Sequence, residues 1–362
     1  MFIRLLVLVV VAALALVPAA EASVRLYAGG LAVVDDPYGP ARLVDLDRGT
    51  VHALYPDGKR FAVGSGFAAL APIRGRATFD RRGATIAGRR VARIATRDVA
   101  VRFRSGDATL AATLMVPPGG GRRAAVAFVT GSGQTTREYL PELQAVFLRH
   151  GIAVLAYDKR GVGGSGGTYP GESPTEGAID VLARDAAAAA RFLAARPAVD
   201  PDRVGLAGHS QAGWIMPLAA TREPAVRFLV TFSGPAVTAD ENDLYQTHAG
   251  EGERPQRLSN GAVDAQVLQR GPGGVDPLPW IAALDVPALW LYGSLDKAIP
   301  PRLSVANLAP IAARDGHDFT VAVLPGGNHA LVRTASGLTT EMLRSDRYAP
   351  GLFTRAATRR RA

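Results

Sequence analysis

The sequence predicts an α/β fold, with a mostly parallel sheet flanked by helices and a smaller β-rich domain before it. Beyond residue 97, apolar runs of strand length alternate with helix-compatible stretches, as in βαβ units. Several runs, such as 124–129 and 152–157, are continuously apolar, which is typical of strands buried on both faces. Before residue 97, short runs are separated by turn residues at regular spacing, which favours antiparallel hairpins.

Length and composition are consistent with one large domain and a smaller one. The chain has 362 residues, of which 48% are hydrophobic, enough for a sizeable core. Its formal charge of +9 is carried almost wholly by arginine, since lysine occurs only at positions 59, 159 and 297. Apart from residues 359–361, we interpret the arginines as dispersed, without the aromatic-interleaved basic stripe of a nucleic-acid binder. The charge therefore indicates compositional bias, with attraction to an acidic envelope or anionic substrate as the alternative.

The first 22 residues have the pattern of a secretory signal peptide. Arg4 precedes an apolar run from Leu5 to Val17, which is too short for a spanning helix, and Ala20-Glu21-Ala22 is a small-x-small cleavage site. We predict cleavage after Ala22, a mature chain that starts at Ser23 and is secreted or periplasmic, and no stable membrane span after cleavage. An uncleaved anchor is the alternative. The absence of cysteine excludes a disulfide framework and a thiol nucleophile.

Residues 23–96 are predicted to form the β-rich N-terminal domain. Strand-like runs at 41–46, 60–63 and 91–95 are separated by turns at 47–49, 56–58 and 81–83. The segment contains no catalytic constellation. We expect a structural role for its one histidine, His52.

The second domain begins at residue 97 with an expected antiparallel hairpin, in which 99–103 and 108–116 flank the turn Ser105-Gly106-Asp107. A helix is expected at 138–149. Ser173 is expected to cap an alanine-rich helix that ends before Pro197, with Glu176 completing a capping box. Buried strands are predicted at 124–129, 152–157, 204–207, 226–232, 288–292 and 319–324. Parallel sheets of this kind carry their active sites at the carboxyl ends of the strands.

A serine stands at the end of one of these strands, in Gly208-His209-Ser210-Gln211-Ala212-Gly213. The run predicts a strand, a sharp turn and a helix, and small residues two positions from Ser210 leave room for a strained turn. It resembles the nucleophile elbow of α/β-hydrolases, with Ala212 where the family usually has glycine. The helix start after the turn would point the N–H of Gln211 at a developing oxyanion.

The resemblance also implies a second oxyanion donor in Thr130-Gly131-Ser132-Gly133-Gln134, which follows another buried strand. By analogy with the family, the donor is the N–H of Ser132, although Gly131 is an alternative. The family most often has histidine at the position of Thr130. A plain turn is the alternative without a functional role.

A glycine-rich stretch at 158–166 matches the G-x-G-x-x-G template of dinucleotide-binding folds. That template requires a helix at the last glycine, whereas Gly167, Pro170 and Pro174 keep this chain irregular, so we expect no nucleotide. The stretch instead resembles the Asp-x-Arg-Gly-x-Gly-x-Ser loop of esterase-type hydrolases, where it is structural. We expect Asp158 and Arg160 to form an ion pair.

Asp296 and His329 each lie just beyond a predicted strand, and a lone residue of either kind is usually incidental. Together with Ser210 they appear in the chain order of α/β-hydrolases, which predicts a catalytic triad. His329 would accept the Ser210 proton, and Asp296 would orient the imidazole. No spacing typical of metal ligands occurs, so neither a metal nor a cofactor is expected.

Residues 237–284 interrupt the alternation with an irregular, Gly-rich and Pro-rich insertion containing Tyr245, His248 and Trp280. By position it should form a small lid over the site, as in the family. We therefore assign 97–354 to an α/β-hydrolase domain and 355–362 to a basic tail. The expected activity is hydrolysis of a small-molecule acyl ester by an exported serine hydrolase. The alternatives are a serine peptidase or amidase, and an inactive binding protein; the oligomeric state is left open.

Overall fold

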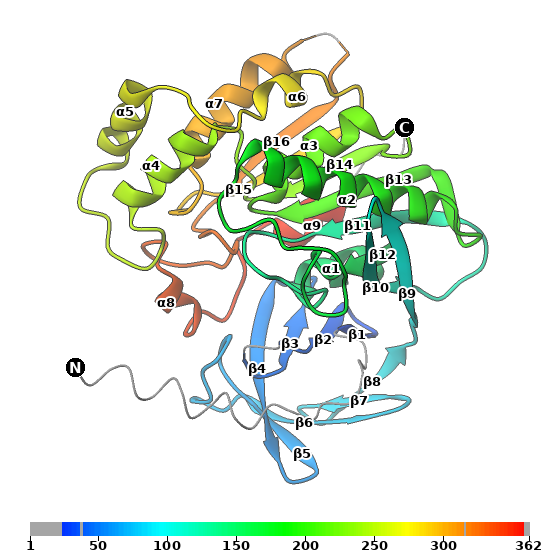
Figure 1. The fold of residues 1–362 in the computed structure, drawn as a ribbon. Helices are drawn as coiled ribbons and strands as arrows, with labels where there is room; N and C mark the ends of the chain where they lie inside the picture. The colour runs from blue at the N-terminus through cyan, green and yellow to red at the C-terminus, as the bar shows by residue number, and fades with distance from the viewer. Residues whose placement is uncertain (1–23, 37–38, 315, 358–362) are drawn as a thin grey trace.

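The computed structural model describes residues 24–36, 39–314 and 316–357 (Figure 1). The predicted signal peptide, its cleavage site and Ser23 lie outside these residues, as do residues 358–362 of the predicted basic tail. Residues 355–357 of that tail belong to a helix. Among the described residues, no helix combines the length and the apolar character needed to cross a bilayer.

The N-terminal part is a closed antiparallel barrel, at the bottom of Figure 1. Each strand pairs with the next, and β1 also pairs with β8. The turns at 47–49, 58–59 and 81–82 lie between paired strands, so the hairpins predicted from the spacing are present, although Pro56 and Asp57 of the second predicted turn belong to β4. The barrel strands are β1 Val24–Tyr27, β2 Leu31–Val34, β3 Arg42–Asp45, β4 Thr50–Asp57, β5 Arg60–Val63, β6 Gly75–Asp80, β7 Gly83–Ile86 and β8 Arg89–Ile94.

The second part contains the mostly parallel sheet that the alternating pattern predicted. Its strand order is β16-β15-β14-β13-β11-β12-β10-β9. Strands β11 to β16 run parallel, while β9 and β10 form the predicted antiparallel hairpin at one edge. The strands are β9 Arg97–Ser105, β10 Ala108–Val116, β11 Arg123–Val129, β12 Ala153–Tyr157, β13 Val199–His209, β14 Phe228–Phe232, β15 Ala288–Gly293 and β16 Phe319–Leu324.

Helices cover both faces of this sheet, which is why its central strands are apolar throughout. One face packs against α2, α3, α6 and α7, and the other against α1, α9 and the outside of the barrel. Figure 1 shows α1 between the sheet and the barrel. The helices are α1 Pro141–Arg149, α2 Glu176–Ala194, α3 Ala212–Arg222, α4 Ala239–Ala249, α5 Asn260–Arg270, α6 Leu278–Ala282, α7 Pro301–Ala312, α8 Thr339–Met342 and α9 Leu352–Ala357.

Two predictions about helices were wrong. The cap of α2 is Thr175 rather than Ser173, because the Thr175 side chain accepts the N–H of Ala178 and leaves Pro174 outside the helix. The 237–284 insertion is not irregular, since it contains α4, α5 and α6. Thr238 and Glu241 form a capping box at α4, and Ser259 caps α5, so the helix-start signals were present in the sequence.

The interpretation of the arginines as dispersed was also wrong. Residues 59–104 contain twelve of the 41 basic residues and two of the 32 acidic ones, which leaves 29 basic and 30 acidic residues in the rest of the chain. All twelve basic side chains are exposed. The positive charge of the protein therefore belongs to β5–β9, where the strand faces that meet solvent are rich in arginine.

Candidate active site

Ser210 lies in a strained turn at the carboxyl end of β13. Its φ of +58° places a non-glycine residue in the left-handed region, and its N–H donates to the Phe232 carbonyl at 3.0 Å. Helix α3 starts two residues later. The turn therefore has the backbone expected for a nucleophile held at a strand end.

The small residues around Ser210 are required by its packing. A Cβ on Gly208 would lie 2.5 Å from the Ala212 Cβ and 2.6 Å from the Val129 carbonyl oxygen. Ala212 is itself fully buried. The turn thus accommodates one methyl group, at position 212, and no second one at position 208.

Asp296 and His329 are in direct contact. The Nδ1 of His329 lies 2.9 Å and 3.1 Å from the two carboxylate oxygens of Asp296. The backbone N–H groups of Ala298 and Ile299 also donate to this carboxylate. Because a carboxylate accepts hydrogen bonds, the proton of neutral His329 is on Nδ1, and Nε2 carries the lone pair of the ring.

His209 links the serine turn to the His329 loop, a role that the sequence reasoning missed. Its Nε2 donates to the His329 carbonyl at 2.9 Å, and its Nδ1 accepts the Tyr139 hydroxyl at 2.9 Å. Complete burial, together with His329 nearby, lowers the pKa of His209 to about 3. His209 therefore stays neutral beside His329 and holds the two loops together; its position directly before Ser210 was the available signal.

The predicted oxyanion loop lies beside Ser210. A Cβ on Gly131 would be 3.3 Å from the Ser210 Cβ, so glycine permits this approach. Ser132 follows at an exposed position. Gln211 is the cap residue of α3, and as such its N–H has no acceptor within the helix. The two predicted donors therefore come from two segments, one that approaches Ser210 at Gly131 and one that follows Ser210 in the chain.

Lys159 contacts both of these segments and was not singled out from the sequence. Its Nζ lies 2.5 Å from the Gly131 carbonyl, 3.0 Å from the Gly133 carbonyl and 3.3 Å from Oε1 of Gln211. The side chain is buried, and burial lowers its pKa to about 8. A signal existed, because lysine is rare in a chain that otherwise uses arginine.

The predicted ion pair between Asp158 and Arg160 was wrong. Asp158 instead pairs with Arg137, and Arg160 pairs with Asp185 on α2 at 2.7 Å. Each side chain therefore pairs with a residue more than 20 positions away in the chain rather than with its near neighbour. Both pairs fix the 158–166 loop, which is the structural role expected for that loop.

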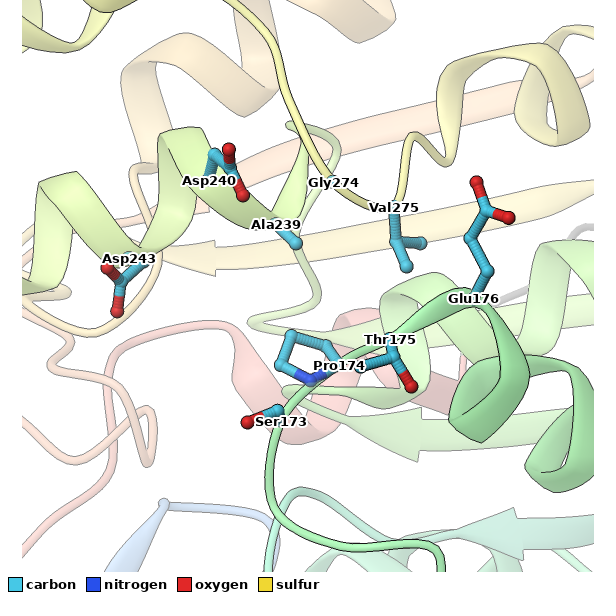
Figure 2. Close-up of a pocket in the computed structure, with 9 residues that line it drawn as sticks. All are labelled: Ser173, Pro174, Thr175, Glu176, Ala239, Asp240, Asp243, Gly274 and Val275. Atoms are coloured by element: carbon cyan, nitrogen blue, oxygen red, sulfur yellow. The ribbon is translucent and has the colours of Figure 1, made fainter.

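The insertion flanks the site. The Tyr245 hydroxyl on α4 donates to the Asp296 carbonyl at 2.7 Å. A hollow of about 600 Å³ lies between the start of α4 and the segment that leads into α2 (Figure 2). Its lining residues include Glu176, Asp240 and Asp243. A substrate group bound in this hollow would lie near acidic residues.

The predicted site residues follow the carboxyl ends of neighbouring strands: Ser132 after β11, Ser210 and Gln211 after β13, Asp296 after β15 and His329 after β16. Among the described residues, no group of three or more His, Asp or Glu side chains is arranged to hold a metal ion. The structure thus places a serine in a strained turn and a histidine paired with a carboxylate at the same edge of the sheet.

Comparisons with known proteins find similarity to hydrolases and to a transferase. Residues 120–262 match the family model described as serine aminopeptidase, S33. Over 127 residues the chain is 30% identical to the polyketide transferase claH of Penicillium crustosum, a match that covers 35% of this chain and 40% of that relative. The chain therefore spans less than half the length of this curated relative.

Solved structures are similar at lower identity. The DcsB protein, solved in complex with its substrate analogue, has a TM-score of 0.50 and 18% identity, covering 69% of this chain and 99% of its own. The esterase Pf2001 of Pyrococcus furiosus has a TM-score of 0.48 and 19% identity, covering 65% and 83%. At 18% identity, the similarity to DcsB shows the fold alone.

Proposed function

We propose that this chain, which has the α/β-hydrolase fold, cleaves carboxylic esters of small molecules, with Ser210 as nucleophile, His329 as base and Asp296 as the orienting acid. The main observation behind the proposal is that two loops meet. One loop holds Ser210 at φ +58°, and the other holds His329, whose Nδ1 contacts the buried carboxylate of Asp296. No cofactor is part of the proposal.

In the first step the Ser210 Oγ attacks the acyl carbon while His329 Nε2 takes its proton. Asp296 fixes the Nδ1–H tautomer and stabilises the imidazolium that forms. Collapse of the tetrahedral intermediate breaks the bond to the alcohol oxygen, which receives the proton from His329. Water then attacks the acyl-serine with the same base, and releases the acid and free Ser210.

The negative charge of the tetrahedral intermediate would be held by the N–H groups of Ser132 and Gln211. The approach of Gly131 to Ser210 and the place of Gln211 at the start of α3 support this role. Donors of this kind are each worth about 10²–10³ in rate, because they are aimed at charge that develops only in the transition state.

A serine peptidase or amidase is the second candidate, and one observation favours it. The hollow beside α4 carries Glu176, Asp240 and Asp243, which would attract the amino group of a peptide substrate. The catalytic steps would be the same, with an amine as the leaving group.

The test is hydrolysis of p-nitrophenyl esters of increasing acyl length beside amino-acid p-nitroanilides. We expect ester turnover in the chain that begins at Ser23, and a fall of at least about 10⁴-fold in kcat for Ser210→Ala. Ser65→Ala, which removes a hydroxyl from a barrel loop, is the matched control and should keep full activity. Turnover of anilides alone would replace the ester proposal by the peptidase. If neither esters nor anilides are turned over and a fluorophosphonate does not label Ser210, the remaining interpretation is an inactive binding protein.

Export is a further part of the proposal, and it rests on the pattern of residues 1–22. We expect the protein recovered from outside the cytoplasm to start at Ser23. Sequencing of its N-terminus checks this, and a start at Met1 on a membrane-bound product would favour the uncleaved anchor.

A further inference from the structure

We propose that Lys159 is a positioning residue that ties together the two halves of the oxyanion site, by holding both the Gly131–Gly133 loop and Gln211. The inference rests on the proposed function, since it concerns the donors that would stabilise the intermediate formed at Ser210. Lys159 itself lies behind these donors and contacts no substrate in the proposed mechanism.

The contacts use the whole hydrogen-bonding capacity of the ammonium group. An ammonium has three N–H donors, and Lys159 has three oxygen acceptors: the carbonyls of Gly131 and Gly133 and the side-chain amide oxygen of Gln211. All three acceptors are uncharged. The two loops come from β11 and β13, so one buried group joins segments that are about 80 residues apart in the chain.

Peptide geometry connects these contacts to the donors. In a trans peptide the C=O and the following N–H lie in one plane and point in opposite directions. When Lys159 binds the Gly131 carbonyl, the N–H of Ser132 is turned away from Lys159. The positive charge at the oxygen end of that peptide also polarises it, which makes the N–H end a better donor.

Arginine would not serve here. Its donors form a flat fork suited to carboxylates and phosphates, whereas the three acceptors around Lys159 belong to separate groups on two loops. The ammonium is compact and directs its protons tetrahedrally. This explains why one of the three lysines of an arginine-rich chain occupies this buried position.

The charge of Lys159 is poorly compensated. The ionisable groups that face it are Glu172, which favours the charged form at a distance, and Tyr169, whose ring centroid lies 5.8 Å from Nζ. Burial outweighs Glu172 and lowers the pKa of Lys159 to about 8. Loss of the proton leaves two N–H donors for three acceptors and removes the charge, so the donors should loosen as the pH rises through this value.

The first experiment compares Lys159→Met with the wild type on the best ester substrate. We expect kcat to fall by about 10²-fold or more while KM stays within about threefold, because the donors act on the intermediate rather than on bound ester. The rate at which a fluorophosphonate labels Ser210 should fall in parallel. Lys59→Met, which removes an exposed lysine from the barrel, is the matched control and should change neither rate.

The second experiment uses pH and chemical rescue. The wild-type kcat should decline above about pH 8, and this decline should be absent from the residual activity of Lys159→Met. The chain has no cysteine, so Lys159→Cys can be alkylated at one site with 2-bromoethylamine in urea and refolded. Restoring an ammonium at that position should raise kcat at least about tenfold over the unalkylated variant, with wild type treated identically as the reference.

The outcomes separate the two proposals. If the wild type neither turns over an ester or anilide nor is labelled at Ser210, the proposed function fails and the positioning role fails with it. If the wild type is active and Lys159→Met keeps its kcat within about threefold, the positioning role alone is overturned. If circular dichroism shows that Lys159→Met does not fold, the dependence of the wild-type kcat on pH tests the positioning role. A wild-type kcat that stays constant up to about pH 9.5 overturns that role.

Discussion

The two halves of the barrel have the same antiparallel architecture and opposite surroundings. Strands β1–β4 turn one set of side chains, including Val33 and Leu54, into the barrel and another set, including Val34 and Val44, onto α1 and α9. Strands β5–β8 also fill the barrel interior, but their outer faces carry exposed arginines. The inner half, β1–β4, is therefore part of the core beneath the sheet. The outer half, β5–β8, is exposed to solvent on its outer face.

Helix α1, which packs on the inner half of the barrel, connects the barrel to the candidate site. Helix α1 packs on β1 and β2, and it starts two residues after Tyr139, whose hydroxyl binds His209. The Gln144 side chain of α1 donates to the carbonyls of Arg137 and Tyr139. The inner half of the barrel thus supports the segment that follows the oxyanion loop, whereas nothing in the outer half contacts the site residues described above.

The largest expected contrast is between two arginines in the two halves. Arg42 on β3 is buried and donates from Nε to Glu142 of α1 at 2.7 Å, while Arg76 on β6 forms an exposed pair with Asp57 at 2.8 Å. Arg42→Met leaves the buried Glu142 carboxylate without its cationic partner and should lower the free energy of unfolding by about 3–5 kcal/mol. Arg76→Met should lower it by less than about 1 kcal/mol.

Urea unfolding followed by tryptophan fluorescence measures this contrast, since all three tryptophans, Trp214, Trp280 and Trp290, lie outside the barrel. A large shift for a barrel substitution would show that the inner half and the hydrolase domain unfold together. Equal midpoints for Arg42→Met and Arg76→Met would contradict the distinction between the halves.

The sequence predicted the sheet and the positions of Ser210, Asp296 and His329 just after its strands, because both depend on local patterns. The contact between Asp296 and His329 is present, while the triad that includes Ser210 stays a prediction. Strand length, apolar character and turn residues placed each side chain just past a strand end, and parallel strands bring those ends together. The barrel hairpins were predicted for the same reason. Their closure into a barrel was not, since it depends on the pairing of β1 with β8, about 65 residues away.

Contacts between distant segments could not be derived in this way. Lys159, His209 and Tyr139 act through partners on other loops, and the partners of Asp158 and Arg160 are chosen by proximity in space. The same holds for the charge: its excess in 59–104 can be counted from the sequence, but its exposure on β5–β8 of the barrel and on the edge strand β9 depends on which strands the rest of the fold covers.

The smallest expected effect concerns the arginines of the outer half. Like charges on neighbouring strands repel, and salt screens exposed charges, so the Tm of the wild type should rise by about 2–4 °C between about 20 mM and about 300 mM NaCl. Replacing Arg74, Arg82 and Arg89 by glutamine should at least halve this rise, as measured by differential scanning fluorimetry. The matched control replaces exposed Arg257, Arg314 and Arg344, which belong to the electrically balanced remainder of the chain, and should keep the full rise. If both triple variants respond alike, the positive charge acts on the molecule as a whole, and the outer half of the barrel is not electrostatically distinct from the rest.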